Sequence, residues 1–227
     1  MPIESASPLA LPAAVIFDLD GVLTDTADLH YRSWQFVADE LGVPFDRQRN
    51  EALRGLSREE SLAKILGPRL GEFTAERQRD ITRRKNDEYL RLVAAMSPAD
   101  LFPGASELLA AIAAAGVPTA VASSSRNAEV VLERLRMREA FRVVIDGNLA
   151  SRSKPDPQVF LEAAKCLGVA AAECVVVEDA ESGVQAGLAA GMRVIGLGPR
   201  ERVGAAHRVV DAISQVTLEL IGEVYRR

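Results

Sequence analysis

The sequence is poor in the residues that build disulfide-linked or thiolate-metal proteins. Its 227 residues include two cysteines, two histidines and one tryptophan. Cys166 and Cys174 show neither a disulfide framework nor the spacing of a zinc site, so we interpret them as reduced structural thiols of a cytoplasmic protein. The first residues, MPIESASPLALPAA, contain Glu4 and no basic stretch, which is not typical of a secretory signal. We expect a loose N-terminal tail there.

Basic charge and long apolar runs are also scarce. The chain has 32 acidic and 27 basic residues, and its net charge of -5 argues against nucleic acid or an anionic membrane as the main partner. The longest apolar run, residues 108–122, is interrupted by Gly116 and Pro118 and is too short to cross a membrane. No large apolar stripe is evident, so we expect a monomer that acts on a small molecule.

The chain does contain a regular alternation of short apolar runs and amphipathic segments. The predicted strands are residues 14–17, 118–122, 142–146, 174–179 and 193–198. The predicted helices between the later strands are residues 105–116, 128–137, 157–168 and 183–191. Strands that alternate with helices indicate a parallel sheet covered on both faces. The expected fold class is therefore α/β, with a Rossmann-like doubly wound parallel sheet as its core.

A helical segment interrupts this pattern just after the first strand. The apolar spacing in residues 28–41 predicts an amphipathic helix that ends at Gly42, and residues 46–93 read as almost entirely helical. Prolines and a glycine at positions 98–104 mark a break before the alternation begins. We therefore expect an α/β core domain formed by residues 1–26 and 98–227, with a helical cap domain inserted at residues 27–97.

Polar side chains follow four of the predicted strands, at the point where each strand ends. They are Asp18 and Asp20 after the first strand, SSSRN (123–127) after the second, Lys154 after the third, and Glu178 with Asp179 at the end of the fourth. In an open parallel sheet, ligands bind beyond the carboxyl ends of the strands. Because all four groups lie at such ends, we expect them to meet at one edge and to form a functional site.

The acids of this group predict a metal site. Carboxylates at short range repel one another and raise each other's pKa unless a cation intervenes. Oxygen ligands favour Mg²⁺ over zinc or copper, and Mg²⁺ suits phosphate chemistry because it shares its coordination with substrate oxygens. The predicted metal ligands are Asp18, Asp20, Glu178 and Asp179. Lys154 and the serine hydroxyls are then available for the remaining phosphate oxygens.

Asp18 and Asp20 allow a division of roles. A carboxylate can attack phosphorus and form an aspartyl phosphate. A second carboxylate two residues along can protonate the leaving oxygen and later deprotonate the acceptor. The pair therefore predicts a phosphoryl-transfer enzyme in which the first strand is a rigid mount for both acids.

Several stretches resemble a known group of enzymes. DLDG (18–21), the serine after the second strand, KPDP (154–157) and EDAESG (178–183) resemble, in order, the motifs of the haloacid dehalogenase superfamily of phosphotransferases. The helical insert resembles the four-helix cap of that superfamily. Within it, the β-phosphoglucomutase family is similar over most of the chain, in the stretches DTADLHYRSW (25–34), GLSREESLAKIL (55–66), RRKNDEYL (83–90), SPADLFPG (97–104) and SSSRN (123–127).

The resemblance implies an activity and a set of residue roles. The activity is that of an intramolecular phosphotransferase, an isomerase that interconverts β-D-glucose 1-phosphate and β-D-glucose 6-phosphate through β-glucose 1,6-bisphosphate, with Mg²⁺ as cofactor. The implied catalytic residues are Asp18 as nucleophile, Asp20 as general acid and base, and Ser123 and Lys154 on the transferring phosphoryl group. The implied metal ligands are Asp18, the backbone carbonyl of Asp20, Glu178 and Asp179.

The resemblance also implies a substrate-binding set on both sides of the cleft. Arg58 would clamp the distal phosphate with help from Ser125, Arg126 and Asn127, and Thr26 would lie in a hinge. The sugar side of the cap would be lined by His30, Trp34, Gly55, Ser61, Lys85 and Asn86. Arg126 stands where relatives are expected to have lysine, which changes a point-charge contact into a bidentate one. Arg54 is interpreted as an exposed cation at a helix end.

Three functions are compatible with these residues. The first is the mutase, and the second is a sugar-phosphate phosphatase of the same superfamily, which uses the same two aspartates but admits water. The cap stretches GLSREES and RRKND argue against the phosphatase. The third is a non-catalytic module that binds sugar phosphates. It is disfavoured because such a module has no need of a nucleophile.

Overall fold

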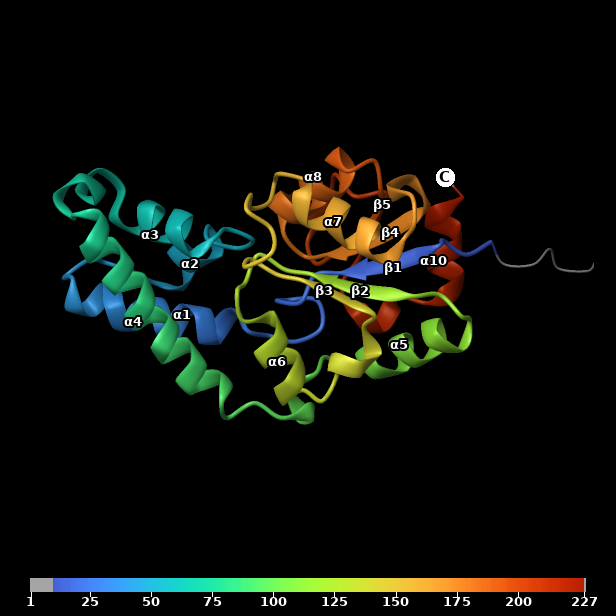
Figure 1. The fold of residues 1–227 in the computed structure, drawn as a ribbon, viewed down its shortest axis with the longest axis horizontal. Helices are drawn as coiled ribbons and strands as arrows, with labels where there is room; N and C mark the ends of the chain where they lie inside the picture. The colour runs from blue at the N-terminus through green and yellow to red at the C-terminus, as the bar shows by residue number, and fades with distance from the viewer. Residues whose placement is uncertain (1–9, 227) are drawn as a thin grey trace, which may run out of the picture.

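The computed structural model describes residues 10–226, so most of the expected N-terminal tail lies outside the described residues. Six parallel strands form one sheet in the order β3-β2-β1-β4-β5-β6 (Figure 1). Their bounds are β1 Ala14–Phe17, β2 Thr119–Ala122, β3 Val143–Ile145, β4 Cys174–Glu178, β5 Arg193–Leu197 and β6 Arg208–Val210. The strand order places β1 at the centre of the sheet, with β2 and β4 as its neighbours.

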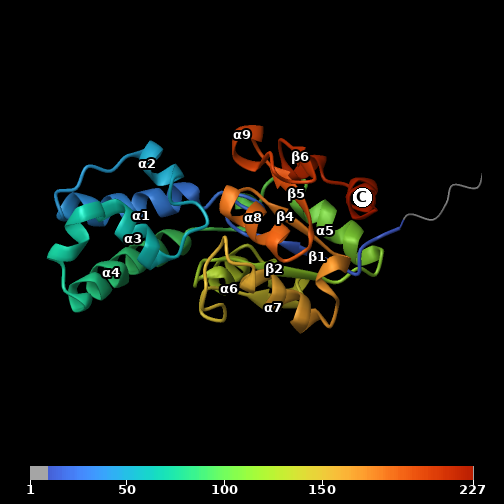
Figure 2. The same ribbon diagram turned by 90° about the horizontal axis from the view of Figure 1, so that it is seen from above.

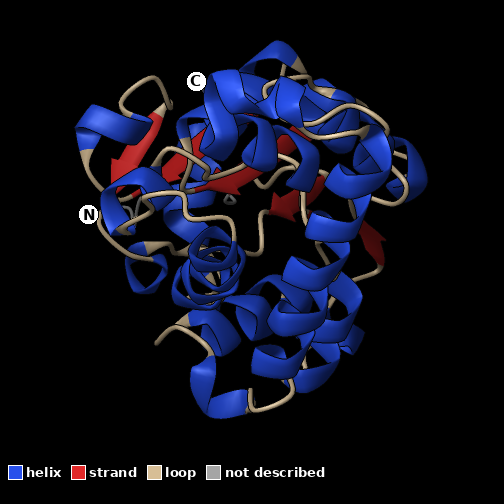
Figure 3. Cartoon of the chain, turned by 90° about the vertical axis from the view of Figure 1, so that its left-hand side faces the viewer, coloured by secondary structure: helices blue, strands red, loops and turns tan. Residues whose placement is uncertain are grey.

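Helices cover both faces of the sheet and form a second body beside it (Figures 1 and 2). The helices of the second body are α1 Ala27–Glu40, α2 Arg47–Glu51, α3 Arg58–Leu66 and α4 Ala75–Val93. The remaining helices are α5 Ala105–Ala114, α6 Ala128–Arg134, α7 Gln158–Leu167, α8 Glu181–Ala189, α9 Arg200–Val203 and α10 Leu218–Tyr225. Figure 3 looks from the side of the helical body and shows the strands of the sheet among the helices.

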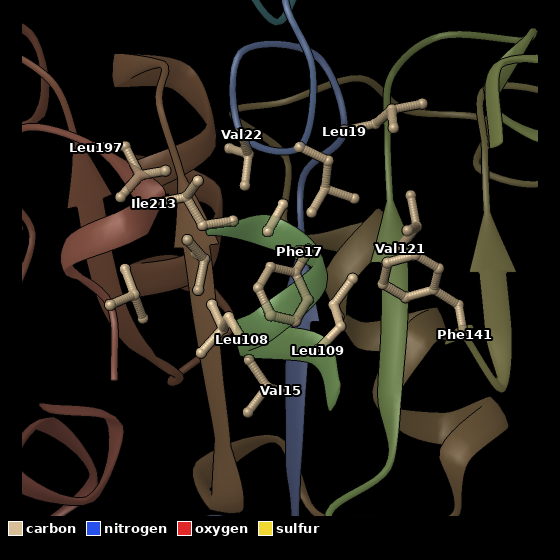
Figure 4. Close-up of a cluster of buried hydrophobic side chains, with 14 of the residues drawn as sticks. Val15, Phe17, Leu19, Val22, Leu108, Leu109, Val121, Phe141, Leu197 and Ile213 are labelled. Carbon is tan, nitrogen blue, oxygen red and sulfur yellow. The ribbon is translucent and has the colours of Figure 1, made fainter. Parts of the chain in front are cut away.

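Side chains alternate between the two faces of each strand, and this alternation creates two hydrophobic clusters. On one face, Val15 and Phe17 of β1 pack with β2 and β4 side chains against α5, α6 and α10 (Figure 4). On the other face, Ala14 and Ile16 pack beneath α7 and α8. The first strand is therefore buried on both faces, which holds the residues that follow Phe17 in a fixed position at the carboxyl edge of the sheet.

The helical body has its own hydrophobic cluster, centred on Trp34, Val37, Leu62 and Ile81. Local sequence defines where its helices begin: Ser57 and Glu60 form a reciprocal capping box at α3, and Thr74 caps α4. The last turns of α4 cross to the other body, because Tyr89 and Val93 belong to the core cluster beneath β1. The two bodies are thus joined by packing as well as by the connecting segments.

The predicted α/β fold and helical insert are confirmed, and the predicted strands are all present. The sequence did not predict β6, α9 or α10. In the case of β6, a strand of three partly exposed residues at the edge of the sheet shows little hydrophobic pattern. Cys174 is buried at the start of β4 as expected, whereas Cys166 is exposed on α7. Across residues 10–226, no helix is both long and apolar enough to cross a membrane.

Candidate active site

A cavity of about 650 Å³ lies between the helical body and the carboxyl ends of the strands. Most of the residues predicted from the sequence line it: Asp18, Asp20, His30, Trp34, Gly55, Arg58, Ser61, Lys85, Ser123, Ser125, Arg126, Asn127, Glu178 and Asp179. Thr26 and Lys154 lie behind this lining and are bonded to Asp20 and Asp18. The structure therefore brings together residues from both bodies that are far apart in the sequence.

Lys154 holds the acids at the floor of the cavity. Its ammonium group donates hydrogen bonds to Asp18 Oδ1 at 2.5 Å, Glu178 Oε1 at 2.7 Å and the Ala122 carbonyl at 3.1 Å. These three acceptors use all three ammonium protons. Burial by itself lowers the pKa of Lys154, but the two carboxylates outweigh it and raise the pKa above its usual range. Burial raises the pKa of Asp18, with the Lys154 ammonium opposing that rise.

Two glycines allow the acids to approach one another. Gly21 has a φ of +88°, and a Cβ there would lie 2.3 Å from Asp179 Oδ2. A Cβ on Gly183 would lie 1.7 Å from Glu178 Oε1. The carboxylates of Glu178 and Asp179 therefore rest directly on backbone, and a side chain at either glycine would displace them.

Asp18, Glu178 and Asp179 form a group of buried carboxylates that could hold a metal ion. One oxygen from each lies within 4.8 Å of the others. The pKa of Asp179 is raised to about 7, chiefly by burial and then by repulsion from Glu178, while Arg54, Arg202 and Lys154 oppose the rise. The pKa of Asp179 stays raised although Lys154, Arg54 and Arg202 are all nearby, so the cluster is a fitting place for a further cation.

The Asp20 side chain turns away from this cluster towards the helical body. The Thr26 hydroxyl donates to Asp20 Oδ1, and His30 Nε2 lies 3.8 Å from the same oxygen. Ser123 donates to Asp20 Oδ2 at 3.4 Å. Burial raises the pKa of Asp20, but contacts with His30, Thr26 and Lys154 hold it below its usual range. The two aspartates therefore have different surroundings, although they are two residues apart.

His30 is fixed by Lys85 from α4. Lys85 Nζ lies 2.9 Å from His30 Nδ1. When Lys85 is protonated it is the donor in this pair, and the proton of a neutral imidazole is then on Nε2, the nitrogen nearer Asp20. Lys85 is 4% exposed and lies over the rings of Trp34 and Tyr89. Burial and the nearby Arg58 lower the pKa of Lys85 to about 7, against the attraction of Asp20. Burial, and then Lys85, likewise lower the pKa of His30.

Positive side chains and amides gather at the far end of the cavity. Asn86 Oδ1 accepts a hydrogen bond from Arg58 at 2.7 Å and another from Asn127 Nδ2 at 2.9 Å. Asn86 on α4 therefore links the two bodies. Burial, and then repulsion from Arg126, lower the pKa of Arg58. Two guanidinium groups that repel each other across a cleft form a site for an anion.

Arg126 already has a carboxylate partner in this structure. Its Nη1 and Nη2 donate to Glu59 Oε1 and Oε2 at 2.8 and 3.2 Å, as a bidentate pair across the cleft. Glu59 was not identified from the sequence, although it is adjacent to Arg58 in the stretch GLSRE. Both side chains are substantially exposed, so the pair is weak.

Arg54 is not the exposed helix-end cation that the sequence suggested. Its Nη1 donates to Asp179 Oδ2 at 2.9 Å, and its Nε donates to Glu51 Oε2 at 2.7 Å. Arg202, also missed from the sequence, donates to the Asp179 carbonyl at 2.6 Å. Arg54, three residues after the end of α2, thus contacts a residue 125 positions away, and sequence spacing carries no sign of such a contact. Its position beside Gly55, in the stretch matched to the family, was the available clue.

The chain's relationship to known proteins agrees with this site. The sequence model of the haloacid dehalogenase-like hydrolase family matches residues 12–191. The chain is 42% identical to a β-phosphoglucomutase of Bacillus subtilis (strain 168) over 94% of this chain and 96% of that protein. A crystal structure of a β-phosphoglucomutase from Clostridium difficile superimposes with a TM-score of 0.92, at 36% identity, and covers 95% of this chain and 98% of that one.

A phosphatase is also among the relatives. The phosphorylated carbohydrates phosphatase of Thermotoga maritima is 29% identical over 94% of this chain and 98% of its own length. The family match covers most of the chain and contains the strand ends that carry the acids, Lys154 and the serines. This chain belongs to the haloacid dehalogenase-like hydrolase family.

Proposed function

We propose that the protein is a β-phosphoglucomutase, which interconverts β-D-glucose 1-phosphate and β-D-glucose 6-phosphate through β-glucose 1,6-bisphosphate. The observation that carries this proposal is that the cavity has anion-binding groups at both ends. Lys154 and Ser123 lie beside the two aspartates, and Arg58, Arg126 and Asn127 lie at the far end. A bisphosphate intermediate needs both ends, since one phosphate transfers while the other is held. The relatives named as β-phosphoglucomutases support the same activity.

The aspartates would divide the chemistry. A carboxylate oxygen of Asp18 attacks phosphorus and forms an aspartyl phosphate, while Asp20 gives the departing sugar oxygen the proton that it took from a sugar hydroxyl in the other half-reaction. In the second half-reaction, Asp20 removes the proton of the sugar hydroxyl as that oxygen attacks the phosphoryl group, and Asp18 is regenerated. Thr26, His30 and Ser123 orient the Asp20 carboxylate for both proton transfers.

Mg²⁺ would be held by Asp18, Asp179 and the backbone carbonyl of Asp20, with Glu178 beside them. The donor set is all oxygen, which suits a hard divalent cation. Glu178 Oε1 and Oε2 also accept hydrogen bonds from Lys154 and from the Ala180 amide, which fix its carboxylate in place. When bound, the ion neutralises the carboxylates and offsets negative charge on the phosphoryl oxygens.

Residues 27–97 would act as a cap domain over a core formed by residues 1–26 and 98–227. A mutase must transfer its phosphoryl group to a sugar hydroxyl rather than to water, so positioning and exclusion of water decide the outcome. Binding of the distal phosphate by Arg58 would help to close the cap and align the sugar. His30, Trp34, Gly55, Ser61 and Lys85 would face the sugar.

The assay that tests this function uses β-glucose 1-phosphate with a trace of β-glucose 1,6-bisphosphate and Mg²⁺. We expect glucose 6-phosphate as product, little reaction with the α anomer, and little free phosphate. Treatment with EDTA should stop the reaction and added Mg²⁺ should restore it. Release of free phosphate as the main product would instead indicate the alternative function, a sugar-phosphate phosphatase. The Thermotoga maritima relative is the reason for considering this alternative.

The protein would act as a cytoplasmic monomer on a small sugar phosphate. Size-exclusion chromatography with light scattering, performed across the concentrations used in the assay, tests the oligomeric state. A mass near 24.4 kDa is expected.

A further inference from the structure

Three consecutive serines follow β2, and their hydroxyls have different surroundings. Ser123 Oγ accepts a hydrogen bond from the Ser125 amide at 3.1 Å, and Ser125 Oγ accepts one from the Asn127 amide at 3.2 Å. These local bonds fix the first and third side chains. Ser124 Oγ is buried and has no hydrogen-bond partner among the residues that the structure describes.

The position of Ser124 is fixed by its neighbours. Gly147 lies against its backbone, since a Cβ at position 147 would come within 2.6 Å of the Ser124 carbonyl oxygen. Ser124 also lines the cavity. In the chain it lies between Ser123, which contacts Asp20, and Ser125, which precedes Arg126 and Asn127. Ser124 thus lies, along the chain, between residues that belong to the two ends of the cavity.

A buried hydroxyl without a partner destabilises the folded chain, because it has lost its hydrogen bonds to water. Such a group persists when a ligand supplies the missing partner. The side chains that face the far end of the cavity, next to the Ser123–Asn127 segment, include the donors Arg58, Arg126 and the amide of Asn127. The ligand that suits them is rich in acceptors, as a phosphate ester is.

We propose that the Ser124 side chain is a further phosphate-binding group, whose hydroxyl donates to a phosphoryl oxygen of the bound sugar phosphate. This role deepens the proposed function and rests on it for the identity of the ligand. The hydroxyl adds a charge-assisted hydrogen bond that only the bound state can form. Ligand-free stability and ligand affinity therefore depend on this side chain in opposite directions.

The experiment compares Ser124→Ala with the wild type by calorimetric titration, in Mg²⁺, with two probes: inorganic phosphate and glucose 6-phosphate. We expect the variant to bind both probes about 10- to 100-fold more weakly, the usual effect of losing one hydrogen bond to a charged group. We also expect its thermal midpoint without ligand to equal or exceed that of the wild type, because an unsatisfied buried group has been removed.

Ser182→Ala is the matched control. Ser182 Oγ is likewise buried without a partner among the described residues, but Ser182 lies against Gly55 and is absent from the cavity lining. Its removal should leave both affinities unchanged. Ser124→Cys separates the hydrogen bond from packing, because a thiol fills similar space but donates weakly. The cysteine variant should bind as poorly as the alanine variant.

The outcomes separate this proposal from the proposed function. Wild-type affinity of Ser124→Ala for both probes, or recovery of affinity in Ser124→Cys, overturns the role of the hydroxyl. If the wild type fails to convert β-glucose 1-phosphate while Ser124→Ala still weakens binding of inorganic phosphate, the proposed mutase activity is wrong and the phosphate contact stands.

Discussion

The core and the helical body each bury one lysine at the same cleft, with opposite consequences. Lys154 of the core lies among acids, and its pKa is raised because Asp18 and Glu178 outweigh the cost of burial. Within residues 10–226, Lys85 of the helical body has no carboxylate in hydrogen-bond contact, and burial with Arg58 nearby lowers its pKa to about 7. The core side of the cleft therefore carries an excess of negative charge, and the cap side carries an excess of positive charge.

This difference indicates which ligand each side receives. An acidic cluster that one lysine only partly neutralises favours a metal cation. Lys85 and Arg58 on the cap side, with Arg126 facing them from the core, favour an anionic substrate. The two sides also satisfy each other in part, because Arg54 pairs with Asp179 and Glu59 pairs with Arg126 across the cleft.

The largest effect should come from the core. Asp18→Asn removes the proposed nucleophile while keeping the shape of the side chain and a hydrogen-bonding group beside Lys154. We expect turnover to fall by about 10⁴-fold or more, with no phosphoenzyme formed. Rapid quench with labelled bisphosphate measures both quantities. Turnover at the wild-type level would remove Asp18 from the nucleophile role.

Asp20→Ala should have the next largest effect. Loss of general acid and base help typically costs about 10²- to 10⁴-fold in rate. The effect should be confined to the step that needs the proton, so a substrate with a good leaving group should form the phosphoenzyme nearly as fast as it does with the wild type. Equal losses for good and poor leaving groups would show that Asp20 acts by position and not by proton transfer.

The cap side should respond differently, in affinity and in partition between sugar and water. Arg58→Ala removes one of the two guanidinium groups at the far end of the cavity, and we expect bisphosphate binding to weaken by about 10- to 100-fold. Free phosphate should rise as a share of the products, since the sugar is held less well. Arg58→Lys keeps the positive charge but loses the planar guanidinium group that can donate two hydrogen bonds to one phosphate. This variant should recover part of the affinity. An unchanged mutase rate in Arg58→Ala would place this residue outside the site.

The two sides of the cleft also differ in how far their residues could be predicted from the sequence. The core site was predictable because its residues follow strand ends, and parallel strands bring their carboxyl ends to one edge. The sequence therefore predicts Asp18, Lys154 and Glu178 as members of one site. Topology accounts for the proximity of Asp18 and Glu178, whereas Lys154 reaches them from the loop between β3 and α7.

The cap side was predictable only through family resemblance. Lys85 lies in an arginine-rich helix whose pattern is typical of a solvated face, yet packing of α4 on α1 buries it against Trp34 and His30. Helical periodicity does not say which cations a neighbouring helix covers. Arg54 was misjudged for a related reason, since its partner Asp179 belongs to the other body.

The buried cap lysine makes stability depend on pH. The unfolded chain keeps the Lys85 proton up to its ordinary pKa of 10.5, whereas the folded chain releases it at about 7. Between these values the unfolded state binds more protons, so this group makes stability rise as pH increases. Lys85→Met removes the effect. The variant should be more stable than the wild type near pH 7, and the difference should shrink as pH approaches 10.

Thermal unfolding of both proteins at several pH values between 6.5 and 10 tests this dependence. Lys165→Met, at an exposed position on α7, is the control for loss of one positive charge. Its stability difference from the wild type should stay small across the range. A constant difference for Lys85→Met would mean that Lys85 keeps its proton in the folded protein.

The smallest effect should come from the pair that crosses the cleft. Glu59→Gln removes the carboxylate that occupies both terminal nitrogens of Arg126 while keeping its size. An anionic substrate then reaches Arg126 without displacing a competitor, so we expect affinity for glucose 6-phosphate to rise by about two- to fivefold, the range of an exposed ion pair. The gain should vanish at high salt, because salt weakens the pair in the wild type. Weaker binding by Glu59→Gln would mean that Glu59 orients Arg126 for the phosphate instead of competing with it. A carboxylate of the helical body would then assist the binding of an anionic substrate.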